Sequence, residues 1–355
     1  SVARLSTAQV HACTTMEHLN PMCAPDDCAT HQRDLDEVTV AGSVTPLTAL
    51  QTARIVQVIS RDDIQRSSAQ TIADILKSAS GVDVRQRGGF GIQTDISIDG
   101  CTFDQITVLL NGIDITSPHT GHHSADFPIS PADIERIEIL EGAAGRAYGG
   151  AAFGGVVNVV TRRDVPLGAM LQGGSFGTFG AGAQASVGGQ SVSAAYTQSD
   201  GGTDNSDFRR VNAFASGVLG RDAVTAVWQA GVVQKRYGAN TFYSAAYPDQ
   251  WEGERRYIVS VTADARLALN GVGTLHFCPA VYWQRAADHF QLMRGLPSGE
   301  NFHRADVYGL EVKAYLTSRW GKTAVGADFR HEGIVSTTLG RPMDSVEWVP
   351  LRFHP

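Results

Sequence analysis

Histidine side chains are concentrated at one point of the chain, in the run His119-Thr120-Gly121-His122-His123. Imidazole nitrogens bind transition metals, and Asp126 adds a carboxylate nearby in the sequence. Adjacent residues of a strand point to opposite faces, however, so His122 and His123 would not share an ion there. We therefore predict a polar loop that faces a substrate, with an exposed turn as the alternative, and no metal site.

Two further groups of side chains have metal-binding chemistry. In the first 34 residues they are thiols and imidazoles, namely His18, Cys23, Cys28 and His31. In later predicted loops they are acids that could hold calcium, namely Asp200, Asp204, Asp207, Asp249 and Glu252. Their spacing is not that of a zinc finger or an EF-hand. We expect a flexible extension over residues 1–34 and solvated acids in the loops, and we predict no cofactor.

The sequence carries no enzymatic motif. It has no Walker loop and no HExxH pair, and the run from Gly173 to Gly177 lacks the strand-turn-helix setting of a hydrolase serine. The net charge of −7 gives no basic surface for the phosphates of a nucleic acid. No apolar run approaches the roughly 18 residues of a membrane-spanning helix. We predict a protein that is not an enzyme and does not bind nucleic acid.

The first folded region combines short strands with two helices. Residues 54–59 alternate and are rich in branched side chains, which predicts a strand, and Ser60 follows as a helix N-cap. A second helix begins near Thr71, with an apolar stripe of Ile72, Ile75 and Leu76, and Gly81 would end it.

Five more strands are predicted in this region, at residues 82–85, 94–98, 106–110, 134–140 and 156–160. Asn111-Gly112 lies between two apolar runs and indicates a tight hairpin, because both residues tolerate positive φ. Together these segments predict an α+β domain, a small mixed sheet with two helices.

From about Pro166 the sequence changes to strands with two-residue alternation. Over residues 257–267 every odd position is apolar, and the even positions from 260 hold Ser, Thr, Asp and Arg. Several runs keep this phase for about 10 residues, the length with which a tilted strand crosses a bilayer. Aromatic residues near the expected strand ends would form interfacial girdles: Trp251, Tyr257, Trp283, Trp320 and Phe329. A transmembrane β-barrel is predicted, with a soluble β-sandwich as the alternative.

Short motifs in the first region resemble the plug domain of TonB-dependent outer-membrane receptors. They are Leu110-Asn111-Gly112, Ile134-Glu135-Arg136-Ile137-Glu138, Tyr148-Gly149 and the run from Phe153 to Thr161. The string GIQTDISIDGCTFDQITVLLNGI, followed by SPHTGHHSADFP, is most similar to the cobalamin-receptor-like branch of Bacteroidetes type. The resemblance implies a plug inside an antiparallel β-barrel, in the outer membrane of a Gram-negative bacterium.

The resemblance divides the chain into four parts. They are the extension at 1–34, a TonB box and linker at 35–45, the plug at 46–163 and the first part of the barrel at 164–355. The family closes about 22 strands around its plug, whereas roughly 190 residues at about 20 per strand and loop supply only about nine or ten. Because an open barrel would leave unpaired strand edges in lipid, we expect the chain to be a fragment with an incomplete barrel.

Outward-facing plug loops touch the ligand in the resembled family. Here these loops are residues 88–95 and 117–127, and the predicted ligand-binding residues are Phe90, Gly91, Ile92, Gln93, Thr94, His119, Thr120, His122 and Asp126. The residues that would bind the periplasmic protein TonB, by adding a strand to its sheet, are Asp36, Glu37, Val38, Thr39 and Val40.

The function implied by the resemblance is active transport, in which external loops capture a scarce ligand and TonB remodels the plug. Cobalamin or another corrinoid is the expected ligand, and a ferric siderophore is the alternative. Outer-membrane lipid and a surface lipoprotein are further expected partners. A signal-transducing receptor is the rival from another class, but the 34 residues before the box are too few for an ordinary signalling domain.

Asp99 departs from the family pattern, which usually has Arg-Gly after the Ile-Ser-Ile strand. A carboxylate at this position would repel Glu138 or Glu141 unless Arg136 or Arg146 compensates. We therefore expect either a weaker latch between plug and barrel or a gene that has drifted from the family pattern.

Overall fold

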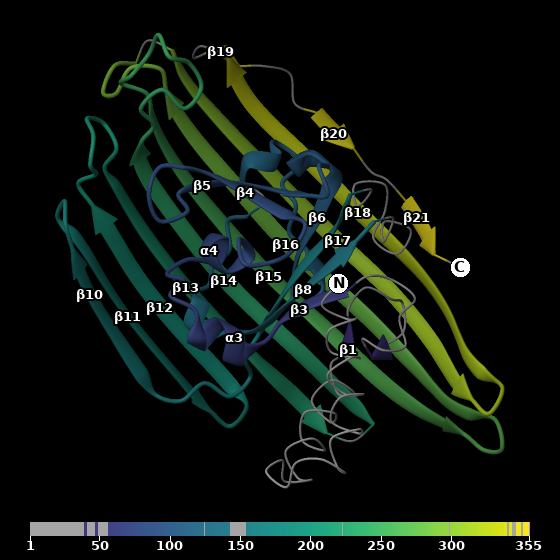
Figure 1. Cartoon of the computed structure of the whole chain (residues 1–355). Helices are drawn as coiled ribbons and strands as arrows, with labels where there is room; N and C mark the ends of the chain where they lie inside the picture. The colour runs from purple at the N-terminus through teal and green to yellow at the C-terminus, as the bar shows by residue number, and fades with distance from the viewer. Residues whose placement is uncertain are drawn as a thin grey trace, which may run out of the picture.

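The computed structural model describes residues 39–40, 47–48, 56–123, 125–142, 154–221, 223–297, 299–338, 341–342, 346–348 and 351–354. These residues form a small α+β domain and one broad antiparallel sheet, which curves around that domain (Figure 1). Within this part of the chain, no helix combines the length and the apolar character needed to cross a membrane. The predicted extension, Asp36 to Val38 of the predicted box, Arg146 and Tyr148-Gly149 lie outside the described residues.

Five strands form the plug sheet, in the order β3 (Val56–Ile59), β8 (Ile134–Glu141), β9 (Gly155–Thr161), β6 (Ile106–Leu110) and β7 (Ile113–Asp114). β6 and β9 run parallel, and the other neighbouring pairs run antiparallel. Every residue of β6 and nearly every residue of β9 is buried, as in a sheet covered on both faces. The predicted mixed sheet is confirmed.

Two of the predicted strands lie outside this sheet. β4 (Val82–Arg87) and β5 (Gln93–Ile98) pair only with each other, so the expectation of one sheet for all plug strands was wrong. A separate short pair is formed by β1 (Thr39–Val40) and β2 (Leu47–Thr48). The predicted hairpin at Asn111-Gly112 joins β6 to β7, and both residues have positive φ, 51° and 82°.

The two predicted helices are present as α3 (Arg61–Arg66) and α4 (Ile72–Leu76). Ser60 and Thr71 cap them, each in a capping box with the acid three residues later. The expected end of α4 at Gly81 was wrong, because the amides of Ser78 and Ala79 already bond three residues back in tight turns. Three single-turn 3₁₀ helices complete the plug: η2 (Phe103–Gln105), η3 (Gly121–His123) and η4 (Pro131–Asp133).

The broad sheet consists of strands that pair with their sequence neighbours from β10 to β18. These strands are β10 (Gly168–Gly174), β11 (Thr178–Val187), β12 (Gln190–Ser199), β13 (Phe208–Arg221), β14 (Val224–Gly238), β15 (Trp251–Leu269), β16 (Gly273–Gln291), β17 (Glu300–Ser318) and β18 (Gly321–Thr338). The short segments β19 (Arg341–Pro342), β20 (Val346–Trp348) and β21 (Leu351–His354) all pair with β18. No pairing joins β10 to β18 in the described part, so the barrel is partial, as predicted.

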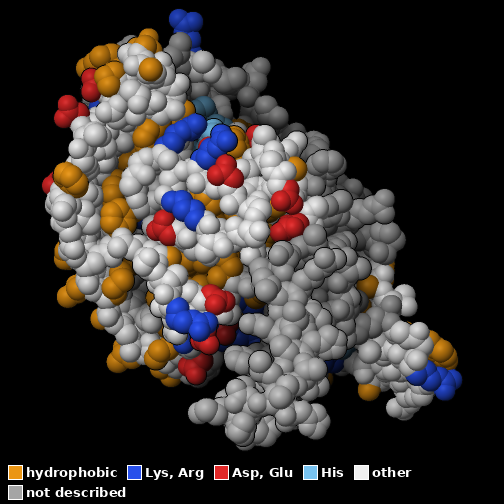
Figure 2. Space-filling view, in the orientation of Figure 1, with side chains coloured by type: hydrophobic (Ala, Val, Ile, Leu, Met, Phe, Trp, Pro, Cys, Tyr) orange, Lys and Arg blue, Asp and Glu red, His pale blue; other side chains and the backbone are white. Residues whose placement is uncertain are grey.

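Alternation sorts the strand residues between two faces. In β15, Glu252, Glu254 and Arg256 are buried on the concave side, whereas Val259 and Val261 are exposed on the other. Figure 2 shows hydrophobic side chains along the outer margin of the sheet and charged side chains gathered over the plug. The concave face also joins the plug core, because Phe214 and Ile258 belong to the same hydrophobic cluster as the plug isoleucines and valines. The predicted apolar outer face is confirmed.

The aromatic residues expected at strand ends are distributed differently. Trp251 begins β15 and Trp320 lies in the turn before β18, as expected. Tyr257, Trp283 and Phe329 lie well inside their strands, because these strands run to 18 or 19 residues, longer than the alternating windows suggested. Only Trp251 and Trp320 therefore lie at strand ends, and the girdle stays a prediction.

Candidate functional site

The first predicted ligand loop, residues 88–95, is held against the strand wall by apolar contacts. Ile92 is 1% exposed and packs with Phe208 of β13 and Tyr237 of β14. The Phe90 ring lies 5.5 Å from the Phe208 ring, centroid to centroid, and Phe90 has the positive φ of 53° that a tight loop imposes. The tip of this loop is therefore anchored in the barrel, and Phe90 and Gly91 keep partial exposure.

The polar residues that follow make specific hydrogen bonds. Gln93 Nε2 donates to the hydroxyl of Tyr243 at 2.6 Å, across the boundary between plug and barrel. Thr94 Oγ1 donates to the Gly91 carbonyl at 3.3 Å, and Asp95 Oδ1 lies 2.6 Å from His122 Nδ1. Ile92, Gln93 and Thr94 are buried, so in this conformation they position the loop and present no surface to a ligand.

The second predicted ligand loop, residues 117–127, carries the histidines. His119 stacks on His303 of β17 with ring centroids 4.2 Å apart, and burial together with the neighbouring histidines lowers the His119 pKa to about 4. His122 packs on Phe103 and pairs with Asp95. His119, Thr120 and His122 all keep partial exposure.

The Gly121–His123 segment is a 3₁₀ turn and not a strand. His122 and His123 still turn to different partners, Asp95 in the plug and the β15 carboxylates. The side chains of His122 and His123 therefore point to different partners, as predicted. The reason is the 3₁₀ turn, and not the alternation of a strand.

Lys235 of β14 is the centre of a buried ionic cluster between plug and barrel. Its Nζ lies 2.7 Å from Asp126 Oδ1 and 3.0 Å from Glu254 Oε2, and it donates to the Ile92 carbonyl. Lys235 is 1% exposed, so these acceptors replace all of its water. Burial and the nearby Glu254 raise the Asp126 pKa to about 7, in spite of Lys235. Asp126 thus joins plug to barrel and is itself buried.

His123 adds the plug's imidazole to the same cluster. Its Nδ1 lies 2.9 Å from Glu254 Oε2, and its Nε2 lies 3.6 Å from Glu252 Oε1. Burial alone would lower the His123 pKa, but the two carboxylates outweigh burial and hold it well above the usual 6.5. Glu252, expected to be a solvated loop acid, is 2% exposed in β15, which corrects that prediction.

Tyrosine hydroxyls fix the carboxylates of β15. Tyr237 and Tyr243 both donate to Glu252 Oε2, at 2.7 Å and 2.6 Å, and Tyr237 also contacts Glu254 Oε1. The second oxygen of Glu252, Oε1, is left facing His123. Each carboxylate therefore has a defined orientation toward the plug.

Barrel side chains also donate to carbonyl oxygens of plug loops. The donor and acceptor pairs are Gln229 with Leu110, Gln284 with Asp114, Arg330 with Thr116, Arg256 with His123 and Arg210 with Phe127. These bonds satisfy plug carbonyls that face the strand wall; Thr116, His123 and Phe127 lie in loops or turns, and Leu110 and Asp114 end their strands. Arg330 adds an ion pair with Asp114, Nη1 to Oδ2 at 2.5 Å.

Sequence analysis missed Lys235, Glu254 and the guanidinium groups of the wall. A signal was present, because a charged residue at an even position of an alternating strand such as 251–260 must lie on the face away from lipid. The sequence does not show which plug residue each charge meets.

Residues 48–156 match the family model described as TonB-dependent Receptor Plug Domain. The chain therefore contains a TonB-dependent receptor plug domain. It is 35% identical over 115 residues to vitamin B12 transporter BtuB of Vibrio cholerae, a match that covers 32% of this chain and 18% of the relative. The match to vitamin B12 transporter BtuB of Photobacterium profundum is 32% identical over 145 residues. It covers 40% of this chain and 23% of that relative.

Among solved structures, the siderophore receptor PiuA from Acinetobacter baumannii aligns with a TM-score of 0.63 at 14% identity. That alignment covers 91% of this chain and 56% of PiuA, and at this identity it carries the fold alone. The chain spans about a fifth of the length of the curated relatives it matches.

TonB-dependent receptors are outer-membrane proteins of Gram-negative bacteria that interact with TonB and take up ligands. The family consists of transporters and receptors. The finer predictions, a Bacteroidetes-type branch and the lack of enzymatic activity, stay predictions.

Proposed function

We propose that this TonB-dependent receptor imports cobalamin or another corrinoid through the outer membrane. The observation that carries the proposal is the identity with two vitamin B12 transporters, 35% over 115 residues and 32% over 145 residues. A ferric siderophore is the second candidate ligand. The likeness to siderophore receptors rests on fold at low identity, so it does not favour that ligand.

The plug must change its contacts for a ligand to pass, because the strand wall holds both of its outer loops. In the proposal, TonB adds the edge of its sheet to residues 36–40 and pulls on the plug. The force would act on the bonds between wall and loop carbonyls and on the ionic cluster around Lys235.

In the proposal, the ligand contacts those predicted residues that are partly exposed, namely Phe90, Gly91, His119, Thr120 and His122. Aromatic and imidazole groups offer an apolar body with a few hydrogen-bonding atoms, which suits a large amphipathic ligand. The buried members, Ile92, Gln93, Thr94 and Asp126, would respond to ligand through the position of their loops. The exposed apolar outer face supports lipid as a partner, and a surface lipoprotein is retained from the family resemblance.

Uptake by cells tests the proposal. The gene that encodes this chain is expressed in a Gram-negative strain without its own cobalamin receptor, and radiolabelled cyanocobalamin and ferric siderophores are supplied in turn. We expect uptake of cyanocobalamin. Accumulation of iron from a siderophore, without uptake of cyanocobalamin, would select the second candidate.

The Val38→Pro variant separates binding from transport. Proline lacks the amide hydrogen that strand addition uses, so cyanocobalamin should still bind to cells while uptake falls to the level of the receptor-free strain. Val38→Ile, which keeps the amide, is the matched control and should transport normally. Equal uptake by the proline variant would refute the role of this segment.

A further inference from the structure

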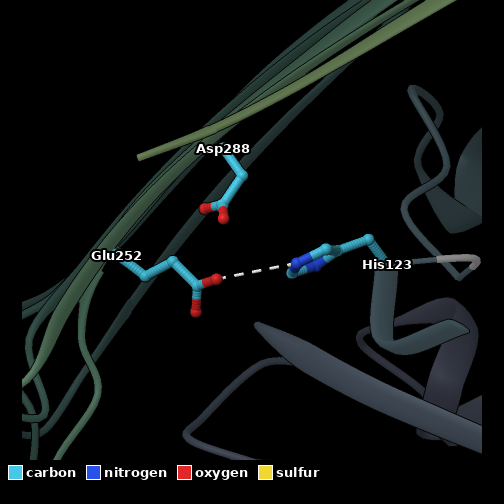
Figure 3. A group of neighbouring side chains, drawn as sticks. All are labelled: His123, Glu252 and Asp288. Atoms are coloured by element: carbon cyan, nitrogen blue, oxygen red, sulfur yellow. Dashed lines mark ion pairs between the residues drawn. The ribbon is translucent and has the colours of Figure 1, made fainter. Parts of the chain in front are cut away.

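His123, Glu252 and Asp288 bring three potential metal ligands together from two separate parts of the fold. His123 comes from the plug, Glu252 from β15 and Asp288 from β16, and their side chains point toward one another (Figure 3). One nitrogen or oxygen atom of each lies within 4.8 Å of the others. Tetrahedral zinc bonds of about 2.0–2.1 Å place ligand atoms roughly 3.4 Å apart, close to the 3.6 Å between His123 Nε2 and Glu252 Oε1.

Glu252 and His123 are already oriented by residues outside the group. Tyr237 and Tyr243 donate hydrogen bonds to Oε2 of Glu252, so Oε1 faces His123. Glu254 Oε2 lies 2.9 Å from His123 Nδ1, the ring nitrogen opposite the one that faces Glu252. A carboxylate behind the imidazole is the usual outer-shell partner of a metal-binding histidine.

Unpartnered polar atoms converge on the same place. His123 is 8% exposed, and its Nδ1 faces Glu254 in an ion pair, so its Nε2 is the nitrogen toward Glu252. Asp288 Oδ1 and His303 Nδ1 are buried without a hydrogen bond. His123, Asp288 and His303 line one cavity of about 20 Å³ together with Lys235, Glu254 and Arg256, and Glu252 lies outside its lining. A cavity of this size has room for a single water molecule or ion. Buried polar atoms without partners indicate that something else satisfies them.

Charge distinguishes this group from its neighbour. The adjacent set of His123, Asp126 and Glu254 already holds the ammonium of Lys235. Between Glu252 and Asp288 the described residues place no lysine or arginine nitrogen within ion-pair distance. Two carboxylates that share a buried site are stable together only with a proton or a cation between them.

We propose that His123, Glu252 and Asp288 bind one divalent transition-metal ion of the zinc class at the interface of plug and barrel. One imidazole and two carboxylates suit Zn²⁺, with the fourth position open to water. The ion ties the histidine loop of the plug to β15 and β16, whichever ligand the receptor carries.

Zinc titration of the purified, metal-stripped chain tests the proposal. Wild type is compared with Asp288→Asn, which keeps the side-chain shape, and with His123→Ala. We expect wild type to bind one Zn²⁺ more than either variant. Zinc bound by the thiols and imidazoles of residues 1–34 is the same in all three proteins and cancels in the comparison. His289→Gln is the matched control, because His289 pairs with Glu300 and lies outside both three-ligand groups of the described chain.

The visible absorption of bound Co²⁺ reports on the site without a count of the bound metal ions. Co²⁺ in a site of low coordination should give visible bands with wild type that disappear in Asp288→Asn, while circular dichroism of that variant stays unchanged. Glu254→Gln should weaken Zn²⁺ binding about 10- to 100-fold, as loss of an outer-shell partner does. Equal zinc binding by wild type and Asp288→Asn, or cobalt bands that persist in that variant, would overturn the proposal.

Discussion

At the scale of single residues, the plug is attached to the barrel mainly by buried charge. Lys235 contacts Asp126, Glu254 and the Ile92 carbonyl, and it has no water to replace any of them. Sequence alternation predicts that Lys235 faces inward, but its plug partners, Asp126 and Ile92, come from more than 100 positions earlier in the chain. Such long-range pairing is set by three-dimensional packing and has no local signal.

Replacing Lys235 with methionine leaves two buried carboxylates without their cation. We expect the free energy that holds the plug in place to fall by about 3–5 kcal/mol. The measurement is cleavage of the plug by a broad-specificity protease at increasing urea concentration. Lys313→Met is the control, since Lys313 pairs with Glu311 at 2.8 Å in a more exposed position of β17. Equal protease resistance of the two variants would contradict the role of Lys235.

Asp99 repels Glu141, as its departure from the family pattern predicts. Both carboxylates lie beside Gly81, and burial first, then Asp99, raises the Glu141 pKa. Because folding raises the Glu141 pKa, protonated Glu141 stabilises the folded protein. That stabilisation is full below the pKa of the unfolded chain and is lost as pH rises through the pKa of the folded protein. Glu138, by contrast, has Arg136 at 2.8 Å, which is the compensation expected.

Asp99→Asn should therefore reduce the loss of plug stability as pH rises from the usual glutamate pKa, about 4.3, through the raised pKa of Glu141 in the folded protein. Asparagine also tolerates the positive φ of 49° at this position, so the turn is kept. Urea denaturation across this pH range measures the effect. An unchanged pH dependence would show that Asp99 does not act on Glu141.

At the scale of elements, local pattern predicted most of the plug and the alternation of the wall. The Asn111-Gly112 turn, the N-caps of α3 and α4 and the apolar outer face follow from residue type and spacing. The pairing of β4 with β5 alone did not follow, because strand partners depend on sequence-distant contacts. Strand lengths were underestimated because polar residues continue each strand beyond its apolar segment.

Gly231 of β14 marks where the strand wall comes closest to the plug. A Cβ at this position would lie 2.6 Å from Pro128 Cγ and 3.0 Å from Phe214 Cδ2. Gly231→Ala should force the plug away from β14 and lower its stability by about 1–3 kcal/mol, measured by the same protease assay. Gly333→Ala in β18 is the control, because nothing lies within 4 Å of its Cβ position. A neutral Gly231→Ala would mean that the plug yields freely at this contact.

At the scale of the whole molecule, the strand wall and the plug share one hydrophobic core and one ionic cluster. The sequence predicted the two parts and their nesting through the family resemblance. The ionic cluster was not predicted, because its members come from the plug, β14, β15 and β16 and meet only after folding. The central claim is that transport requires these shared contacts to open.

A reversible cross-link between plug and wall tests that claim most directly. Asn212 Nδ2 of β13 donates to Ser130 Oγ of the plug at 3.3 Å, so Ser130→Cys with Asn212→Cys places two thiols next to each other. The measurement is uptake of cyanocobalamin by cells that carry the double variant, before and after reduction, with each single variant as a control. We predict that the oxidised receptor binds cyanocobalamin but does not import it, and that reduction restores uptake. Full uptake by receptor that gel analysis shows to be cross-linked would contradict the account.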